Sequence, residues 1–347
     1  MKLENLLTEG IRLGASDIHL TMGTEPMVRV NGRLQKMNDK IVNKDKINNL
    51  VDELLEDRRN QFEADKELDF AYQWDGYRFR VNAFYQRNNP ALVLRIIPNQ
   101  IDDLDSLGLP EKLKKLAVEP RGLFLVTGPT GSGKSTTLAA MINLVNQNYS
   151  KHIITLEDPI EYIHQHKKSL VNQREVGRDT IDFASGLKAA LRQDPDIILV
   201  GEMRDLETIS TAITAAETGH LVLATLHTNN AAETIDRIIN VFPPYQQEQI
   251  RTQLSMNLKG VLAQQLLPTV DGLERKVATE LLLVNSAVKN LIREGKNHQL
   301  DSVMQTSKHE GMHTMDYSLR DLYLQGKISH QVALEQANDR QTLEKLI

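Results

Sequence analysis

The chain contains no cysteine, and its only tryptophan is Trp74. Disulfide bonds and thiolate zinc sites are therefore excluded, which suits a reducing compartment such as the cytoplasm. No apolar run approaches the ~18 residues that a membrane-spanning helix requires. The first residues, Met1–Asn5, lack the apolar segment of a signal peptide. If the protein works at a membrane, we expect a partner to hold it there.

Basic side chains are not in excess. Lysine and arginine number 41 against 46 aspartate and glutamate, so the formal net charge is -5. Nucleic-acid-binding proteins usually carry a basic excess, so this balance argues against that class. The 347 residues, of which 40% are hydrophobic and 25% charged, are typical of an ordinary globular protein with about two domains.

Residues 1–98 predict an α+β domain with an antiparallel sheet. Turn signals at Asn31-Gly32 and Asp75-Gly76 separate short apolar runs that read as strands. Proline, glycine and an aspartate cluster make residues 99–116 a predicted linker. The predicted helices of this domain are Leu3–Leu13 and Ile47–Phe62, and its predicted strands are Ser16–Leu20, Met27–Val30, Leu68–Tyr72, Tyr77–Tyr85 and Ala91–Ile97.

Residues 117–347 predict an α/β domain. Apolar strands alternate with helices, which indicates a parallel sheet covered on both faces. Val261–Leu267 and Val277–Val284 predict an added antiparallel hairpin, and the region from about residue 286 reads as mostly helical. The predicted strands are Gly122–Thr127, His152–Leu156, Asp196–Val200 and Leu221–Leu226, and the predicted helices are Thr136–Val145, Asp182–Arg192, Leu206–Glu217 and Ala231–Ile239.

Residues 128–135 match the phosphate-loop pattern G-x-x-x-x-G-K-[ST] (Walker A) and lie between a predicted strand and a predicted helix. Glycines let backbone N–H groups surround a polyphosphate, Lys134 can reach the β- and γ-phosphates, and the Ser135 hydroxyl can ligate Mg²⁺. The alternative to a phosphate-binding loop is a glycine-rich turn in which the Lys-Ser pair occurs by chance. The residues predicted to contact ATP are Gly128, Pro129, Thr130, Gly131, Ser132, Gly133, Lys134, Ser135 and Thr136.

Polar side chains follow the other parallel strands, whose carboxyl ends share one edge of the sheet. Glu202 is predicted to support Mg²⁺ or to polarise the attacking water, with an ordinary exposed glutamate as the alternative. Glu157 and Asp158 are candidate metal ligands, because carboxylates near a triphosphate repel it unless Mg²⁺ intervenes. His227 is placed to sense the γ-phosphate, whereas His220 is expected to be a structural or relay hydrogen-bonder.

Three arginines mark the first domain. Arg78 and Arg80 alternate with apolar residues, so period two puts both on one face of the sheet, and Arg95 lies on the next strand. A solvated or interdomain face is one interpretation, and phosphate contact in trans is the other.

Together these segments resemble the secretion ATPases and, within them, the PilT-type retraction motors of type IV pili, which power twitching motility. The segment Ala287–Lys296 is similar to the C-terminal stretch of retraction motors, although an ordinary packed helix explains it equally well. The other markers are the phosphate loop, Ile154–Glu161, Val200–Asp205 and Thr218–Thr228.

The resemblance implies a homo-hexameric ring of subunits, each with a PAS-like N-terminal domain and a RecA-like P-loop ATPase domain. It implies ATP and Mg²⁺ between subunits, with Arg78, Arg80 and Arg95 supplied to the bound nucleotide. Glu161 would be the water-activating base, with Glu202 supporting the metal. The implied partner is an inner-membrane platform protein, which would place the motor at the cytoplasmic face of that membrane.

Other functions remain open at this stage. Pilus-assembly and type II secretion ATPases commonly carry a longer N-terminal region and a cysteine-rich zinc insert, which disfavours them here. A PilU-type accessory motor fits the sequence equally well. The acidic net charge counts against a nucleic-acid translocase, and the carboxylates at the strand ends count against a non-hydrolysing ATP-sensing scaffold.

Overall fold

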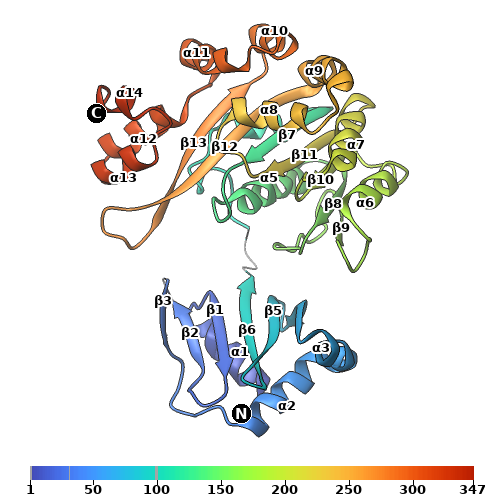
Figure 1. The fold of residues 1–347 in the computed structure, drawn as a ribbon, viewed down its shortest axis with the longest axis vertical. Helices are drawn as coiled ribbons and strands as arrows, with labels where there is room; N and C mark the ends of the chain where they lie inside the picture. Colours follow the sequence, from blue (N-terminus) through green and yellow to red (C-terminus); the bar gives the residue numbers. More distant parts are fainter. Residues whose placement is uncertain (1, 31, 98–100) are drawn as a thin grey trace. The chain divides into compact units, whose positions relative to one another are not determined.

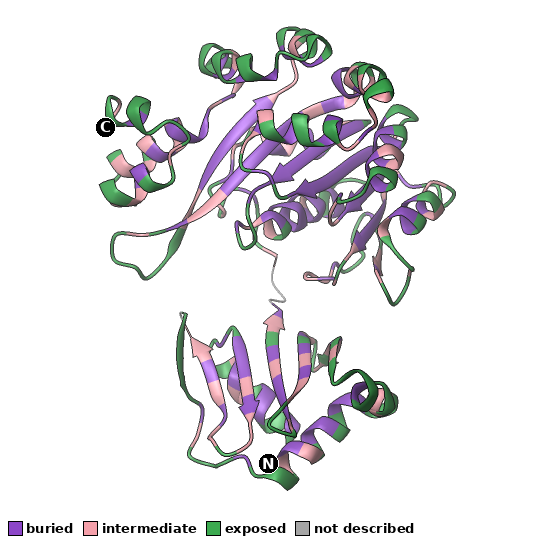
Figure 2. Cartoon of the chain, in the orientation of Figure 1, coloured by how far each residue is buried: buried purple, intermediate pink, exposed green. Residues whose placement is uncertain are grey.

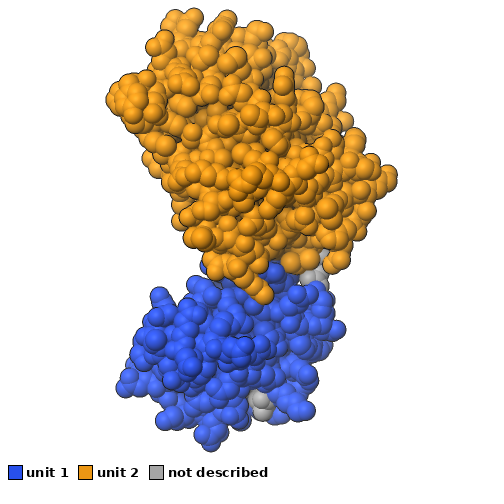
Figure 3. Space-filling view, turned by 90° about the vertical axis from the view of Figure 1, so that its right-hand side faces the viewer, with its two compact units in different colours: residues 1–100 blue, residues 101–347 orange. Residues whose placement is uncertain are grey.

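The computed structural model describes residues 2–30, 32–97 and 101–347. The chain divides into two compact units, residues 1–100 and 101–347, which Figure 3 colours separately. The predicted turn residue Asn31 and the predicted domain boundary at residues 98–99 lie outside the described residues. Within the described part of the chain, every helix is too short or too polar to span a bilayer.

The first unit is a six-stranded antiparallel sheet in the order β3-β2-β1-β6-β5-β4. The apolar faces of its helices pack on one side of the sheet, and β5 buries Phe79, Val81 and Ala83 there (Figure 2). Arg80 is consequently exposed on the opposite side. The elements are α1 (Leu3–Arg12), β1 (Asp17–Thr21), β2 (Met27–Val30), β3 (Arg33–Lys36), α2 (Lys44–Leu55), α3 (Arg59–Asp65), β4 (Glu67–Trp74), β5 (Tyr77–Gln86) and β6 (Asn89–Ile97) (Figure 1).

The single helix predicted over Ile47–Phe62 is wrong. Helix α2 ends at Leu55, and a short 3-10 turn over Glu56–Arg58 separates it from α3. Glu56 has a φ of 46°, a left-handed value that a continuous α-helix does not allow. The apolar periodicity continues through the break, so periodicity alone did not reveal it.

The second unit is a seven-stranded sheet in the order β13-β12-β7-β11-β10-β8-β9. All neighbours are parallel except β12 and β13, which form the predicted antiparallel hairpin. The strands are β7 (Gly122–Thr127), β8 (His152–Glu157), β9 (Leu170–Glu175), β10 (Ile197–Val200), β11 (Leu221–Leu226), β12 (Leu258–Pro268) and β13 (Arg275–Leu283).

Helices cover both faces of this sheet, as the alternating pattern predicts (Figure 1). One apolar cluster joins α4 and α5 to one face, and another joins α6 to α9 to the opposite face. The helices are α4 (Lys112–Leu116), α5 (Lys134–Asn148), α6 (Phe183–Ala190), α7 (Leu206–Glu217), α8 (Ala231–Asn240), α9 (Pro244–Asn257), α10 (Ser286–Glu294), α11 (Leu300–Thr306), α12 (Met315–Leu324), α13 (His330–Glu335) and α14 (Arg340–Glu344).

Candidate nucleotide site

The phosphate loop runs from the end of β7 to the first residue of α5. Gly128, Gly131 and Gly133 have φ values of 139°, 80° and 92°, which L side chains rarely adopt. A Cβ on Gly128 would lie 2.3 Å from the Gln264 carbonyl oxygen of β12. Glycine is therefore required at Gly128 by both its conformation and its surroundings.

Lys134 is the first residue of α5, two positions earlier than the helix predicted from sequence. Its Nζ donates to the carbonyl oxygens of Gly128 and Pro129, at 2.8 and 3.0 Å. Burial lowers the pKa of Lys134, while the negative charges of Glu202 and Glu161 oppose that shift. Lys134 therefore lies within electrostatic range of both candidate catalytic carboxylates.

The chemistry of this loop fits a polyphosphate. Helix α5 begins at the loop, so its N–H groups and its partial positive charge favour an anion there. The Ser132 hydroxyl is buried and has no hydrogen-bond partner among the described residues. The Thr136 hydroxyl lies 2.8 Å from the hydroxyl of Tyr162, a residue that no sequence pattern had indicated.

Glu202 lies just past the end of β10 and bridges two basic side chains. Its Oε1 is 2.6 Å from Arg204 Nε and 3.2 Å from His227 Nε2, which follows the end of β11. Burial favours a higher pKa for Glu202, but the hydrogen bond from Arg204 and the charge of His227 hold it below the ordinary value. Glu202 is therefore an ionised carboxylate beside the phosphate loop.

Glu157, at the end of the neighbouring strand β8, is held differently. Its Oε1 accepts from Thr155 Oγ1 at 2.6 Å and from Gln173 Nε2 at 3.1 Å. Burial raises the pKa of Glu157. In the described ranges, no group of three or more His, Asp or Glu side chains is arranged to hold a metal ion. The metal roles of Glu157 and Asp158 stay predictions.

His220 contacts the backbone of the preceding helix. Its Nδ1 lies 3.0 Å from the carbonyl oxygen of Ala215, which ties the start of β11 to the end of α7. Arg204, by contrast, was not selected from the sequence as a site residue, although it lies only two positions after Glu202. The one feature of the sequence that could have indicated Arg204 is its position shortly after a glutamate at the end of a predicted strand.

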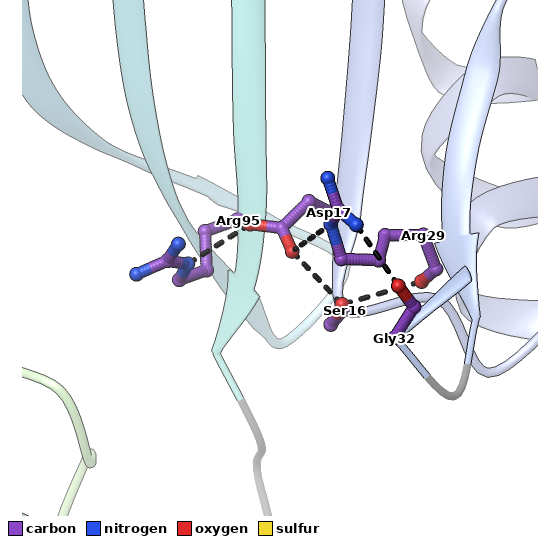
Figure 4. A network of polar contacts seen from close by, with 5 residues as sticks. All are labelled: Ser16, Asp17, Arg29, Gly32 and Arg95. Carbon is purple, nitrogen blue, oxygen red and sulfur yellow. Dashed lines mark hydrogen bonds and ion pairs between the residues drawn. The ribbon is translucent and has the colours of Figure 1, made fainter. Parts of the chain in front are cut away.

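The arginine face belongs to the first unit. Arg80 and Arg95 are direct cross-strand partners on β5 and β6, and Arg78 follows the same alternation. Arg95 Nε lies 2.9 Å from Oδ1 of Asp17 on β1, as Figure 4 shows. Arg80 lies 3.9 Å from Asp69. Asp17 was not identified from sequence, because an isolated Asp beside a short strand has no distinguishing pattern.

A phosphate loop after β7 of a parallel sheet, with a carboxylate at the same edge after β10, two strands away, defines a P-loop nucleotide hydrolase. The model of the protein family described as "Type II/IV secretion system protein" matches residues 1–282 of this chain. The chain belongs to this family, and it is an ATPase.

Individual relatives narrow the comparison. The chain is 48% identical to the type IV pilus retraction ATPase PilT of Pseudomonas aeruginosa, over 97% of this chain and 98% of that protein. It is 46% identical to the type IV pilus ATPase PilU of the same organism, over 100% of this chain and 91% of that protein. A crystal structure of the pilus retraction motor PilT with bound ADP matches with a TM-score of 0.93 and 50% identity, covering 99% of each chain.

Proposed function

We propose that this chain is the motor that hydrolyses ATP to retract type IV pili. The observation that carries the proposal is the phosphate loop, with Lys134 in the field of Glu202 and Glu161, in a chain that matches a retraction motor over nearly its whole length. The loop N–H groups and Lys134 bind the β- and γ-phosphates, and the contacts of Thr136 with Tyr162 fix the start of α5.

Magnesium suits the oxygen donors at this site. Ser135 and Glu202 would hold Mg²⁺, which would neutralise charge on the phosphates. Glu161 is the general base that accepts a proton from the attacking water, and Glu202, held by Arg204 and His227, keeps negative charge at the metal side. His227 links the γ-phosphate to Glu202.

The motor acts as a homo-hexamer. Arg78, Arg80 and Arg95 reach the nucleotide of a neighbouring subunit, where an arginine is worth about 10³–10⁵ in rate in well-studied phosphoryl-transfer enzymes. A platform protein in the cytoplasmic membrane receives the force, so the ring works on the cytoplasmic side.

Deletion of the gene, followed by imaging of live cells, tests this function. The expected result is abundant surface pili that no longer shorten, restored by the wild-type gene and not by Lys134→Ala. Loss of pili would contradict retraction and indicate assembly.

An accessory role of the PilU type is the second candidate, because the identities to PilT and PilU, 48% and 46%, are nearly equal. Expression of this gene as the sole retraction motor in a strain lacking all others separates the two. A principal motor restores pilus shortening alone, whereas an accessory motor does so only together with a second motor.

A further inference from the structure

One row of charged residues crosses four neighbouring strands of the first unit. Asp17 on β1 pairs directly with Arg29 on β2 and with Arg95 on β6, and Arg95 pairs directly with Arg80 on β5. Residues directly opposite one another on adjacent strands share a face of the sheet. The row therefore places three cations and one anion side by side on the face opposite the apolar core.

The row brings two like charges together. Like charges directly opposite each other destabilise a sheet, and Arg80 and Arg95 are such a pair. The one carboxylate in the row is shared, because Asp17 Oδ1 lies 2.9 Å from Arg95 Nε and Oδ2 lies 3.9 Å from Arg29 Nε. Arg80 in turn lies 3.9 Å from Asp69 of β4, and the side chains of Arg80 and Arg95 stay exposed, so a further anion can reach both.

Asp17 is buried and held by hydrogen bonds, whereas the side chain of Arg95 extends into solvent. The Asp17 residue is 6% exposed, while the Arg95 side chain is 62% exposed. Ser16 Oγ donates to Asp17 Oδ2 at 2.8 Å, and Arg29 donates to the Gly32 carbonyl oxygen at 3.0 Å, so the surroundings of the carboxylate are themselves held (Figure 4). The hydrogen bonds from Arg95 and Ser16 keep the pKa of Asp17 low against the opposing effect of burial.

The way Asp17 holds Arg95 matters for phosphate recognition. Asp17 contacts the guanidinium at Nε, and Figure 4 shows the terminal nitrogens of Arg95 on the side away from Asp17. A guanidinium held at Nε presents its two terminal amino groups as a fork, which is the geometry that binds phosphate oxygens in a bidentate manner. Fixing the rotamer beforehand also reduces the entropy lost when the phosphate binds.

We propose that Asp17 is a positioning residue, which aims Arg95 at the phosphates of the nucleotide held by a neighbouring subunit. The inference rests on the proposed function, in which Arg95 acts in trans. Asp17 itself touches no substrate, and its effect on turnover passes entirely through Arg95.

The test is a double-mutant cycle on purified hexamers. Asp17→Asn keeps the shape of the side chain but removes its charge, and kcat for ATP is expected to fall about tenfold, the value of one charge-assisted hydrogen bond. Arg95→Ala is expected to lower kcat by about 10³ or more. Asp17→Asn added to Arg95→Ala should change kcat no further, because the arginine through which Asp17 acts is gone.

Asp52→Asn is the matched control. It breaks another Asp–Arg ion pair of the same unit, with Arg59, away from the charged row, and it should leave kcat unchanged. Ser16→Ala provides a second variant that preserves all charges and loosens only the carboxylate, with an expected smaller decrease in kcat. Thermal unfolding and light scattering on each variant show whether the fold and the hexamer persist.

The possible outcomes distinguish a failure of the positioning role of Asp17 from a failure of the proposed role of Arg95 in trans. If Arg95→Ala turns over ATP at the wild-type rate, the role of Arg95 in trans is wrong. If Arg95→Ala is slow but both Asp17→Asn and Ser16→Ala match the wild type, the positioning role is overturned. A further loss of kcat from Asp17→Asn in the Arg95→Ala background would also overturn it, since Asp17 would then act by another route.

Discussion

Two glutamates of the same sheet, Glu202 and Glu280, have opposite environments. Glu202 lies at the edge beyond β10, between Arg204 and His227, and its pKa is held below the ordinary value. Glu280 lies within β13, is 1% exposed, and accepts from the backbone N–H groups of Ala231 and Met315 at 2.8 and 3.3 Å.

The difference lies in the partners. Burial raises the pKa of Glu280 to about 7, and the negative charges of Asp301 and Asp316 add to that rise, while the hydrogen bonds from the backbone amides of Ala231 and Met315 only partly oppose it. The hydrogen bond from Arg204 helps to hold the pKa of Glu202 low against the opposing effect of burial. Amide partners make Glu280 a tie that joins β13 to the starts of α8 and α12. The same side chain thus has a lowered pKa at the rim of the sheet and a raised pKa in its interior.

The largest effect is expected from Glu202→Gln. Removing the charge at the metal side should lower kcat by about 10²–10³, the usual range for loss of one electrostatic contribution to a transition state. The melting temperature should change little, because the side chain is at the edge of the sheet. Steady-state ATPase assays and thermal unfolding check both expectations. An unchanged kcat would show that the charge of Glu202 does not contribute to ATP hydrolysis.

Glu280 should make stability depend on pH. Its pKa rises from 4.5 in the unfolded chain to about 7 in the folded state, a difference equivalent to roughly 3 kcal/mol. The folded state binds the proton more tightly, so this contribution is complete below pH 4.5 and is lost as the pH rises through about 7. The melting temperature should therefore fall between pH 5 and pH 8.

Glu280→Gln should flatten that decline, since glutamine stays neutral and still accepts a backbone hydrogen bond. A residual slope is expected from Asp301 and Asp316, because burial raises the pKa of both. The measurement is thermal unfolding of wild type and variant across this pH range. Equal slopes in the two proteins would show that Glu280 is not the titrating group.

His227→Gln tests the histidine that completes the edge site. Glutamine can place an N–H near the position of His227 Nε2, which lies 3.2 Å from Glu202, but it cannot carry a positive charge. We expect kcat to fall about tenfold with KM for ATP nearly unchanged, as for loss of one hydrogen bond made mainly in the transition state. A larger change in KM than in kcat would instead indicate a role in ground-state binding.

Glu157→Gln should have the smallest effect on turnover and decides an open question. Glu157 resembles Glu280 in having neutral partners, Thr155 and Gln173, and glutamine can keep one of those hydrogen bonds. If Glu157 is structural, kcat should stay within about twofold of the wild type, well under 1 kcal/mol. A loss as large as that of Glu202→Gln would support the metal role predicted from its position after β8.

The sequence predicted the parallel core because its strands are continuous apolar runs. It missed β9, an edge strand of which only Val171 and Glu175 are buried. It also missed α9, whose buried residues are only Ile250, Leu254 and Ser255. Segments with so little burial carry no strong periodicity, and their structure depends on neighbours that are distant in sequence.

The candidate site was also predicted only in part: its local motif was found, and its pairings between distant residues were missed. The phosphate loop is local, so residues 128–135 revealed it. Asp17 and Arg95 are 78 positions apart, and Thr136 meets Tyr162 across 26 positions. Pairings of this kind follow from strand register and loop path, which composition and spacing do not contain.

The close approach of Gly128 to the Gln264 carbonyl oxygen has a mechanical consequence. The strands that carry them are hydrogen-bonded neighbours, with Ala263 paired to Thr127 at the base of the loop. Even one added carbon at residue 128 would collide with the backbone of β12. A spectroscopic probe on the β12–β13 hairpin would therefore sit next to the phosphate-binding end of the sheet and test whether nucleotide binding changes its surroundings.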